Sequence, residues 1–148
     1  MSELPPLLRD QRKIDVEHLK LLAIFHFVVA GLAVLGILFL LLHYTMMSTV
    51  MNNPDLWKNQ KKPDFDPKQF FDAFKWFYLF MGSLFLLNGI GNLISGFCIR
   101  ARTCRIFSLI VAGVNCFLFP FGTALGIFTF VVLLRDSVRE VYEASAMS

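Results

Sequence analysis

Three long stretches without any Asp, Glu, Lys or Arg limit what this chain can fold into. The first runs from Leu21 to Leu42, and its only ionisable side chain is His26. A helix over these 22 residues is about 33 Å long at about 1.5 Å per residue, enough to cross a bilayer core of about 30 Å. The second stretch runs from Trp76 to Ile99 and has the same reach. Both stretches predict helices that span a membrane.

The composition agrees with a membrane protein of one domain. Of the 148 residues, 56% are hydrophobic and 17% are charged, against about 45–50% and about 25% in soluble domains. The first apolar stretch is longer than the roughly 7–15 residues of a signal peptide and does not end at a small-residue cleavage site, so we expect a retained helix. The net charge of +3 is mild, and no basic polar domain suited to nucleic acid is present. The three cysteines are too few for a disulfide framework and are predicted to be reduced: Cys98, Cys104 and Cys116.

The third uncharged stretch, from Ile106 to Leu134, is too long for one straight span and slightly short for two. Pro120 lacks a helix donor and Gly122 can adopt a left-handed turn. We predict a tight hairpin of two short helices that turns at Pro120–Gly122. One kinked helix, or a re-entrant hairpin that does not cross, are the alternatives.

The positions of the basic residues discriminate between these alternatives. If the hairpin returns to the side where it began, nine of the 14 basic residues lie on one side of the membrane, among them every arginine. The positive-inside rule then puts both termini in the cytoplasm. A single kinked helix would carry the C-terminal arginines outside, whereas a re-entrant hairpin keeps the same sides. The nine are Arg9, Arg12, Lys13, Lys20, Arg100, Arg102, Arg105, Arg135 and Arg139; the other five are Lys58, Lys61, Lys62, Lys68 and Lys75.

The predicted fold is therefore all-α, a transmembrane bundle of four helices that forms a single membrane domain over residues 1–148. The spans are expected at about 21–43, 76–99, 104–119 and 122–140, with an outer loop at 44–75. Within that loop, the segment 59–67 is rich in turn residues. The segment 68–75 puts three phenylalanines on one face and predicts an interfacial helix that leads into the second span.

A few polar residues lie inside the predicted spans. His26 is costly in lipid, so a proton relay or haem ligand is conceivable, although a neutral histidine bonded to a neighbouring helix is the more ordinary interpretation. Asn88 and Asn92 are four residues apart and share one helix face, and Asn115 could be their partner. These asparagines either line a path for a solute or hold helices together by hydrogen bonds, and we favour the second interpretation.

Small residues mark the predicted helix contacts. Gly89 and Gly96 lie near the asparagines, and Gly122 and Gly126 form a small-x-x-x-small face after the turn. We expect that face to pack inside the hairpin, with a partner chain as the alternative. The five arginines at positions 100, 102, 105, 135 and 139 form a basic rim that we interpret as a topology signal, with anionic headgroups as its alternative ligand.

The sequence has no motif for catalysis. It contains no GxxxxGK[ST] phosphate loop, no GxSxG nucleophile elbow and no HExxH zinc pair. The acidic residues lie in the predicted loop, in the tails or, for Asp136 and Glu140, at the end of the last span, so no pair of carboxylates faces each other within an uncharged stretch. We expect no enzymatic activity, no cofactor and no metal.

The C-terminal third resembles a family of small bacterial membrane proteins of unknown function. Its motifs are Phe-Pro-Phe-Gly-Thr at Phe119–Thr123, Leu-Gly-x-Phe-Thr at Leu125–Thr129 and Arg-x-Ser-Val at Arg135–Val138, after an arginine-rich link. A weaker resemblance covers His18–Leu32, so about half the chain is involved. The resemblance implies a bacterial inner membrane and four helices, and it implies no activity.

Two functions from different classes fit these features. The first is a non-enzymatic accessory or scaffold subunit, or a self-associating membrane protein, whose partners are the lipid bilayer and other membrane subunits or itself. The alternative is a small oligomeric solute or ion pathway lined by Asn88, Asn92, Asn115 and His26. A weaker third is an electron carrier that holds a cofactor at His26.

Overall fold

The computed structural model describes residues 6–57 and 67–146, and in this part of the chain helices joined by short turns are the only regular structure, with no strand. Two of its helices are long and apolar enough to cross a membrane, and α5 and α6, which meet at a bend of 75°, could together count as a third span. The all-α class is therefore confirmed, and membrane association is supported. The helices are α1 (Pro6–Met51), α2 (Pro54–Trp57), α3 (Pro67–Ala101), α4 (Arg105–Asn115), α5 (Phe121–Leu133) and α6 (Asp136–Ala146).

The two long helices extend well beyond the apolar stretches that predicted them. α1 begins at Pro6, a residue favoured in the first helical position, and its 46 residues give a length of about 69 Å. It ends at Met51 and so takes up the start of the expected loop at 44–75. α3 begins at Pro67, so the expected interfacial helix at 68–75 is its first two turns. Most of the turn-rich segment 59–67 lies outside the described residues.

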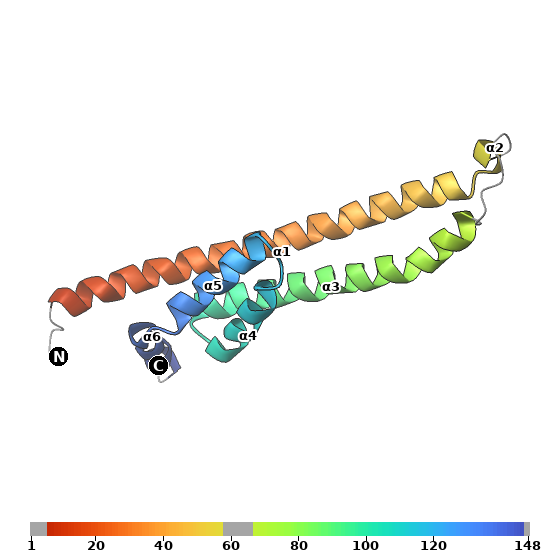
Figure 1. The fold of residues 1–148 in the computed structure, drawn as a ribbon. Helices are drawn as coiled ribbons and strands as arrows, with labels where there is room; N and C mark the ends of the chain where they lie inside the picture. Colours follow the sequence, from red (N-terminus) through yellow and green to blue (C-terminus); the bar gives the residue numbers. More distant parts are fainter. Residues whose placement is uncertain (1–5, 58–66, 147–148) are drawn as a thin grey trace. The chain divides into compact units, whose positions relative to one another are not determined.

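The chain divides into two compact units, each described by itself. Unit 1 comprises Met1–Gly31 and Asn88–Ser148, and unit 2 comprises Leu32–Leu87. Unit 1 therefore contains part of α1, the last turns of α3, and the helices α4, α5 and α6 (Figure 1). Its hydrophobic core is formed by Leu19, Leu22, Ala23, Ile99, Leu125, Val132, Leu133, Val138, Val141 and Tyr142.

The turn between α3 and α4 closes the end of α3 without glycine. The backbone N–H of Thr103 donates to Cys98 O at 2.8 Å, and that of Arg102 donates to Ile99 O at 3.1 Å. This is the Schellman pattern, which satisfies the last carbonyls of a helix and usually has glycine in its left-handed position. Here Arg102 takes that position, with φ 55°, and Cys104 is also left-handed, with φ 50°. The left-handed conformation costs a non-glycine residue roughly 1–2 kcal/mol.

The hairpin of α4 and α5 is closed by contacts that require glycine for its size. A Cβ on Gly122 would lie 2.6 Å from Asn115 O, and one on Gly126 would lie 2.5 Å from Ala112 O. The Thr123 hydroxyl donates to Cys116 O at 2.8 Å and so satisfies a carbonyl at the end of α4. The expectation that Gly122 supplies a left-handed turn is wrong, because no glycine of the described residues has positive φ. Gly122 lies inside α5 and serves close backbone approach instead.

The two hairpin helices are shorter than the expected segments 104–119 and 122–140. α4 ends at Asn115, and it could not in any case continue through Pro120, whose ring would clash with the carbonyl four residues earlier. The turn therefore occupies residues 116–120, just before the expected position, and contains a cis Phe119–Pro120 peptide. At the other end, α5 stops at Leu133, and the chain bends before α6.

Unit 2 consists of α2 and the parts of α1 and α3 that fall between Leu32 and Leu87. His43 Nδ1 lies 2.6 Å from the Tyr78 hydroxyl, and the rings of Tyr44 and Phe71 stack at 5.6 Å. Gly36 faces the ring of Phe85, which would lie 3.1 Å from a Cβ at that position. Aromatic contacts therefore join the two long helices within this unit.

Candidate functional site

The asparagines predicted to meet do so, in a closed network between α3 and α4. Asn92 and Asn115 are fully buried and exchange two hydrogen bonds. Asn92 Nδ2 donates to Asn115 Oδ1 at 2.9 Å, and Asn115 Nδ2 donates to Asn92 Oδ1 at 2.8 Å. Asn88 Nδ2 also donates to Asn115 Oδ1, at 3.0 Å. Three side-chain bonds thus cross one helix interface inside an apolar environment.

The network also closes on itself along α3. Asn92 Nδ2 lies within bonding distance of both the backbone oxygen and the Oδ1 of Asn88, at 2.9 and 3.2 Å. The carbonyl oxygens of all three amides therefore accept hydrogen bonds from within the network. Amide groups that satisfy one another in this way favour helix packing over contact with a solute.

His26 does not join this network by any hydrogen bond among the described residues. The side chain is fully buried, and its Nδ1 lies 2.9 Å from the backbone oxygen of Leu22. Because a carbonyl oxygen can only accept, Nδ1 must carry the proton, and Nε2 of the neutral ring is left as an acceptor. No side chain or backbone group of residues 6–57 and 67–146 forms a hydrogen bond with Nε2. The structure thus separates the expected cluster into an amide network and an independent histidine.

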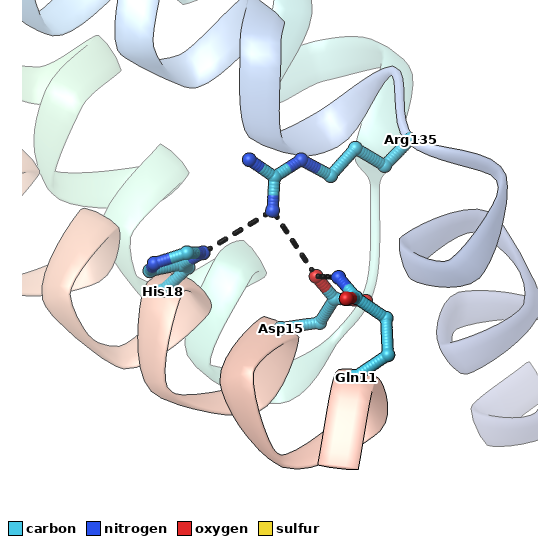
Figure 2. Close-up of polar contacts among 4 residues, drawn as sticks. All are labelled: Gln11, Asp15, His18 and Arg135. Carbon is cyan, nitrogen blue, oxygen red and sulfur yellow. Dashed lines mark hydrogen bonds and ion pairs between the residues drawn. The ribbon is translucent and has the colours of Figure 1, made fainter. Parts of the chain in front are cut away.

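A second polar cluster joins α1 to the junction between α5 and α6, and the sequence did not single it out (Figure 2). Arg135 Nη1 lies 3.3 Å from Asp15 Oδ1 and 3.3 Å from His18 Nδ1, and Gln11 Nε2 donates to Asp15 Oδ1 at 3.2 Å. The Asp15 side chain is 0% exposed and that of Arg135 is 35% exposed. The cluster is a partly buried ion pair between residues 120 positions apart.

Arg135 is the donor in both of its contacts, because a guanidinium group only donates. His18 Nδ1 and Asp15 Oδ1 are the acceptors. The other oxygen of the carboxylate, Asp15 Oδ2, is buried and has no hydrogen-bond partner in the described part of the chain. Asp15 continues the buried stripe of α1 that includes Leu19, Leu22 and His26. Extending the helical period of that stripe backwards is the sequence signal that points to it.

Two other rim arginines, Arg105 and Arg139, make separate contacts. Arg105 Nε donates to Leu133 O at 2.8 Å, so it binds the last carbonyls of α5, and Arg139 pairs with Glu143 on the surface of α6 at 2.9 Å. Beside the rim, burial raises the pKa of Tyr142 to about 12. Arg105 therefore joins the start of α4 to the end of α5.

Two further predicted packing residues lie on α3. A Cβ on Gly96 would lie 2.7 Å from the ring of Phe27, so α1 and α3 approach closely at this point. Gly89 is half-buried.

No group of three or more His, Cys, Asp or Glu within residues 6–57 and 67–146 is arranged to hold a metal ion. The three cysteines are free thiols. The arrangement of these polar groups favours helix packing, with His26 as the exception. Comparison with known protein families, curated proteins and solved structures finds no match. The resemblance to a family of small bacterial membrane proteins stays a prediction.

Proposed function

We propose that the protein is a non-enzymatic integral membrane protein that acts as an accessory or scaffold subunit or associates with itself. The observation that carries this proposal is the amide network, in which Asn88, Asn92 and Asn115 bond to one another across α3 and α4. These three amide side chains join helices and are not free to bind a substrate. The exposed large side chains of α1 and α3 are mainly Leu, Ile, Val and Phe, which suits contact with lipid or with another membrane helix.

The proposed topology has two crossing helices, α1 and α3, and a re-entrant hairpin made by α4 and α5. With 11 and 13 residues, the hairpin helices are about 16 and 20 Å long, against the roughly 30 Å of a bilayer core. These lengths favour a hairpin that reaches the middle of the membrane and returns, in place of four crossing helices. α6, with its charged residues, then lies at the same interface as Arg135.

Both termini are proposed to be cytoplasmic. Arg100, Arg102 and Arg105 precede the hairpin, and Arg135 and Arg139 follow it, so a re-entrant hairpin leaves all of them on one side, as the positive-inside rule requires. The resemblance noted in the sequence adds the bacterial inner membrane to this proposal.

Labelling of cysteines from the outside of intact cells tests the topology. A Phe119→Cys variant without native cysteines puts a thiol at the hairpin turn, and a Leu56→Cys variant serves as the control on α2. A membrane-impermeant maleimide should label Cys at 56 and leave Cys at 119 unlabelled. Labelling at both positions would contradict the re-entrant hairpin.

Purification of the tagged protein in mild detergent tests the function. Size exclusion and mass spectrometry should find a partner in fixed proportion, or a discrete multiple of 16.9 kDa. A monomer that brings no partner would contradict both forms of the proposal.

A second candidate, the oligomeric solute or ion pathway, keeps one observation in its favour. His26 Nε2 is a buried acceptor that no described residue bonds to, and a polar path would need such a group. Because the amides of Asn88, Asn92 and Asn115 are engaged with one another, such a path would have to use other groups. Ion and water flux into liposomes, compared between the wild type and His26→Ala, tests this candidate.

A further inference from the structure

Five buried side-chain polar atoms in unit 1 have no hydrogen-bond partner among the described residues. Two of them are Asp15 Oδ2 and the Tyr142 hydroxyl. The other three come from three different helices: His26 Nε2 of α1, Ser95 Oγ of α3 and Ser108 Oγ of α4. All three residues are 0% exposed. A buried polar atom without a partner costs roughly 1–3 kcal/mol, and most such atoms in proteins are satisfied by protein groups or by ordered water. Three in one core therefore indicate a common partner.

The two serines lie at the same level of the antiparallel pair α3 and α4. Asn88 and Asn115 are hydrogen-bonded and so mark one level of this pair. Ser95 follows Asn88 by seven residues, and Ser108 precedes Asn115 by seven. Each serine is thus about 10 Å from that level, in the same direction.

His26 lies at this level as well. The ring of Phe27 comes within 2.7 Å of where a Cβ on Gly96 would be, so these two positions face each other on α1 and α3. His26 precedes Phe27 by one residue, and Ser95 precedes Gly96 by one. Because the helices are antiparallel, His26 and Ser95 differ in height by about two residue rises, or ~3 Å.

The serines also differ from a serine on the lipid-facing surface. In an apolar environment a helical serine usually bonds back to a carbonyl of its own helix. Ser83 does so, with bonds of 2.6 Å to Leu79 O and 3.1 Å to Phe80 O. Ser95 and Ser108 make no such bond, so their hydroxyl groups remain available to a ligand.

The chemistry of the three groups selects the ligand. His26 Nε2 can only accept, because Nδ1 carries the proton. A ligand must therefore donate to the histidine, and it can accept from either serine. The set contains no charged side chain to compensate an ion. Water meets each requirement, and buried waters typically make about three hydrogen bonds of this kind.

We propose that His26 Nε2, Ser95 Oγ and Ser108 Oγ together bind a water molecule in the core of unit 1. The site is distinct from the amide network and from the Asp15 cluster. It makes His26 a hydrated acceptor inside the membrane domain, held in one tautomer by Leu22.

Solid-state NMR of protein labelled with ¹⁵N-histidine in phospholipid bilayers tests the proposal on the full chain. The His26 signals are assigned by their loss in His26→Gln. We expect a protonated Nδ1, an unprotonated Nε2, and magnetisation transfer from water protons to Nε2. A Ser95→Ala/Ser108→Ala variant should lose this transfer, while Ser83→Ala should retain it.

Three results would overturn the proposal. A proton on Nε2 would contradict the tautomer, and an unprotonated Nε2 without water transfer would show that the site is dry. Transfer that persists in the folded serine double variant would exclude the serines as ligands. The first two results come from the wild-type protein, so the test does not depend on the folding of any variant.

Discussion

Removing the reciprocal bond between Asn92 and Asn115 should weaken the interface of α3 and α4 by a predictable amount. The two side chains exchange two hydrogen bonds, at 2.9 and 2.8 Å. A bond between membrane helices contributes about 0.6 kcal/mol on average and at most about 1.7. A double-mutant cycle of Asn92→Ala and Asn115→Ala should therefore give a coupling of about 1.2 kcal/mol, with an upper limit near 3.4.

The single variants should follow the number of bonds that each one removes. Asn88→Ala loses one bond across the interface, Asn92→Ala loses two, and Asn115→Ala loses three. The expected losses in the free energy of unfolding are about 0.6, 1.2 and 1.8 kcal/mol in that order.

Unfolding by SDS in mixed micelles, followed by far-UV circular dichroism, gives these free energies. Leu93→Ala, whose side chain is 44% exposed, is the matched control from the same helix and should change little. If the Asn92 and Asn115 variants were additive within about 0.3 kcal/mol, the proposed bonds between them would not exist.

Three further predictions use other parts of unit 1. Gly126→Leu should prevent stable folding, because even a Cβ at that position would lie 2.5 Å from Ala112 O. The control is Gly31→Ala, whose added Cβ meets no described atom within 4 Å. Melting temperatures in detergent should be lower for Gly126→Leu than for Gly31→Ala, and equal values would refute the close approach. Arg135→Ala should lower the free energy of unfolding by about 1–3 kcal/mol, which is less than for a fully buried pair because Arg135 is 35% exposed. Adding Asp15→Asn to this variant should restore part of the lost free energy, as measured by SDS titration. No restoration would count against the ion pair. Burial raises the pKa of Tyr142 from 10.0 to about 12, so the contribution of the protonated phenol to stability is complete below about pH 10 and is lost as the pH rises toward 12. The unfolding midpoint of the wild type should fall over that range, and that of Tyr142→Phe should fall less. Identical pH profiles would contradict the raised pKa.

The sequence anticipated the features that depend on local pattern. Uncharged apolar runs cannot be buried in so short a chain except against lipid, so Leu21–Leu42 and Trp76–Ile99 identified the two long helices. The spacing of Asn88 and Asn92 follows the helical period, which put both amides on one face. Asn115 completed the network because an amide in an apolar environment needs an amide partner.

The lengths of the hairpin helices needed the structure. Composition allowed Ile106–Leu134 to be one helix, two helices or a re-entrant loop, because hydropathy does not record where a helix ends. Pro120 limits α4, yet the turn lies before Gly122, and close packing against Asn115 O explains this glycine. A turn motif in a sequence does not distinguish a left-handed glycine from one that only lacks a side chain.

What the sequence by itself determined was the all-α class, the association with a membrane and the faces that carry the asparagines, since each follows from spacing along one helix. Only the tertiary structure decided that Asp15 and His18 meet Arg135, and that His26 lies apart from the amide network. These residues are distant in sequence, and their meeting depends on how α1 and α5 pack. The same packing makes the buried layer of His26, Ser95 and Ser108, because no spacing within one helix brings atoms of three helices to one level.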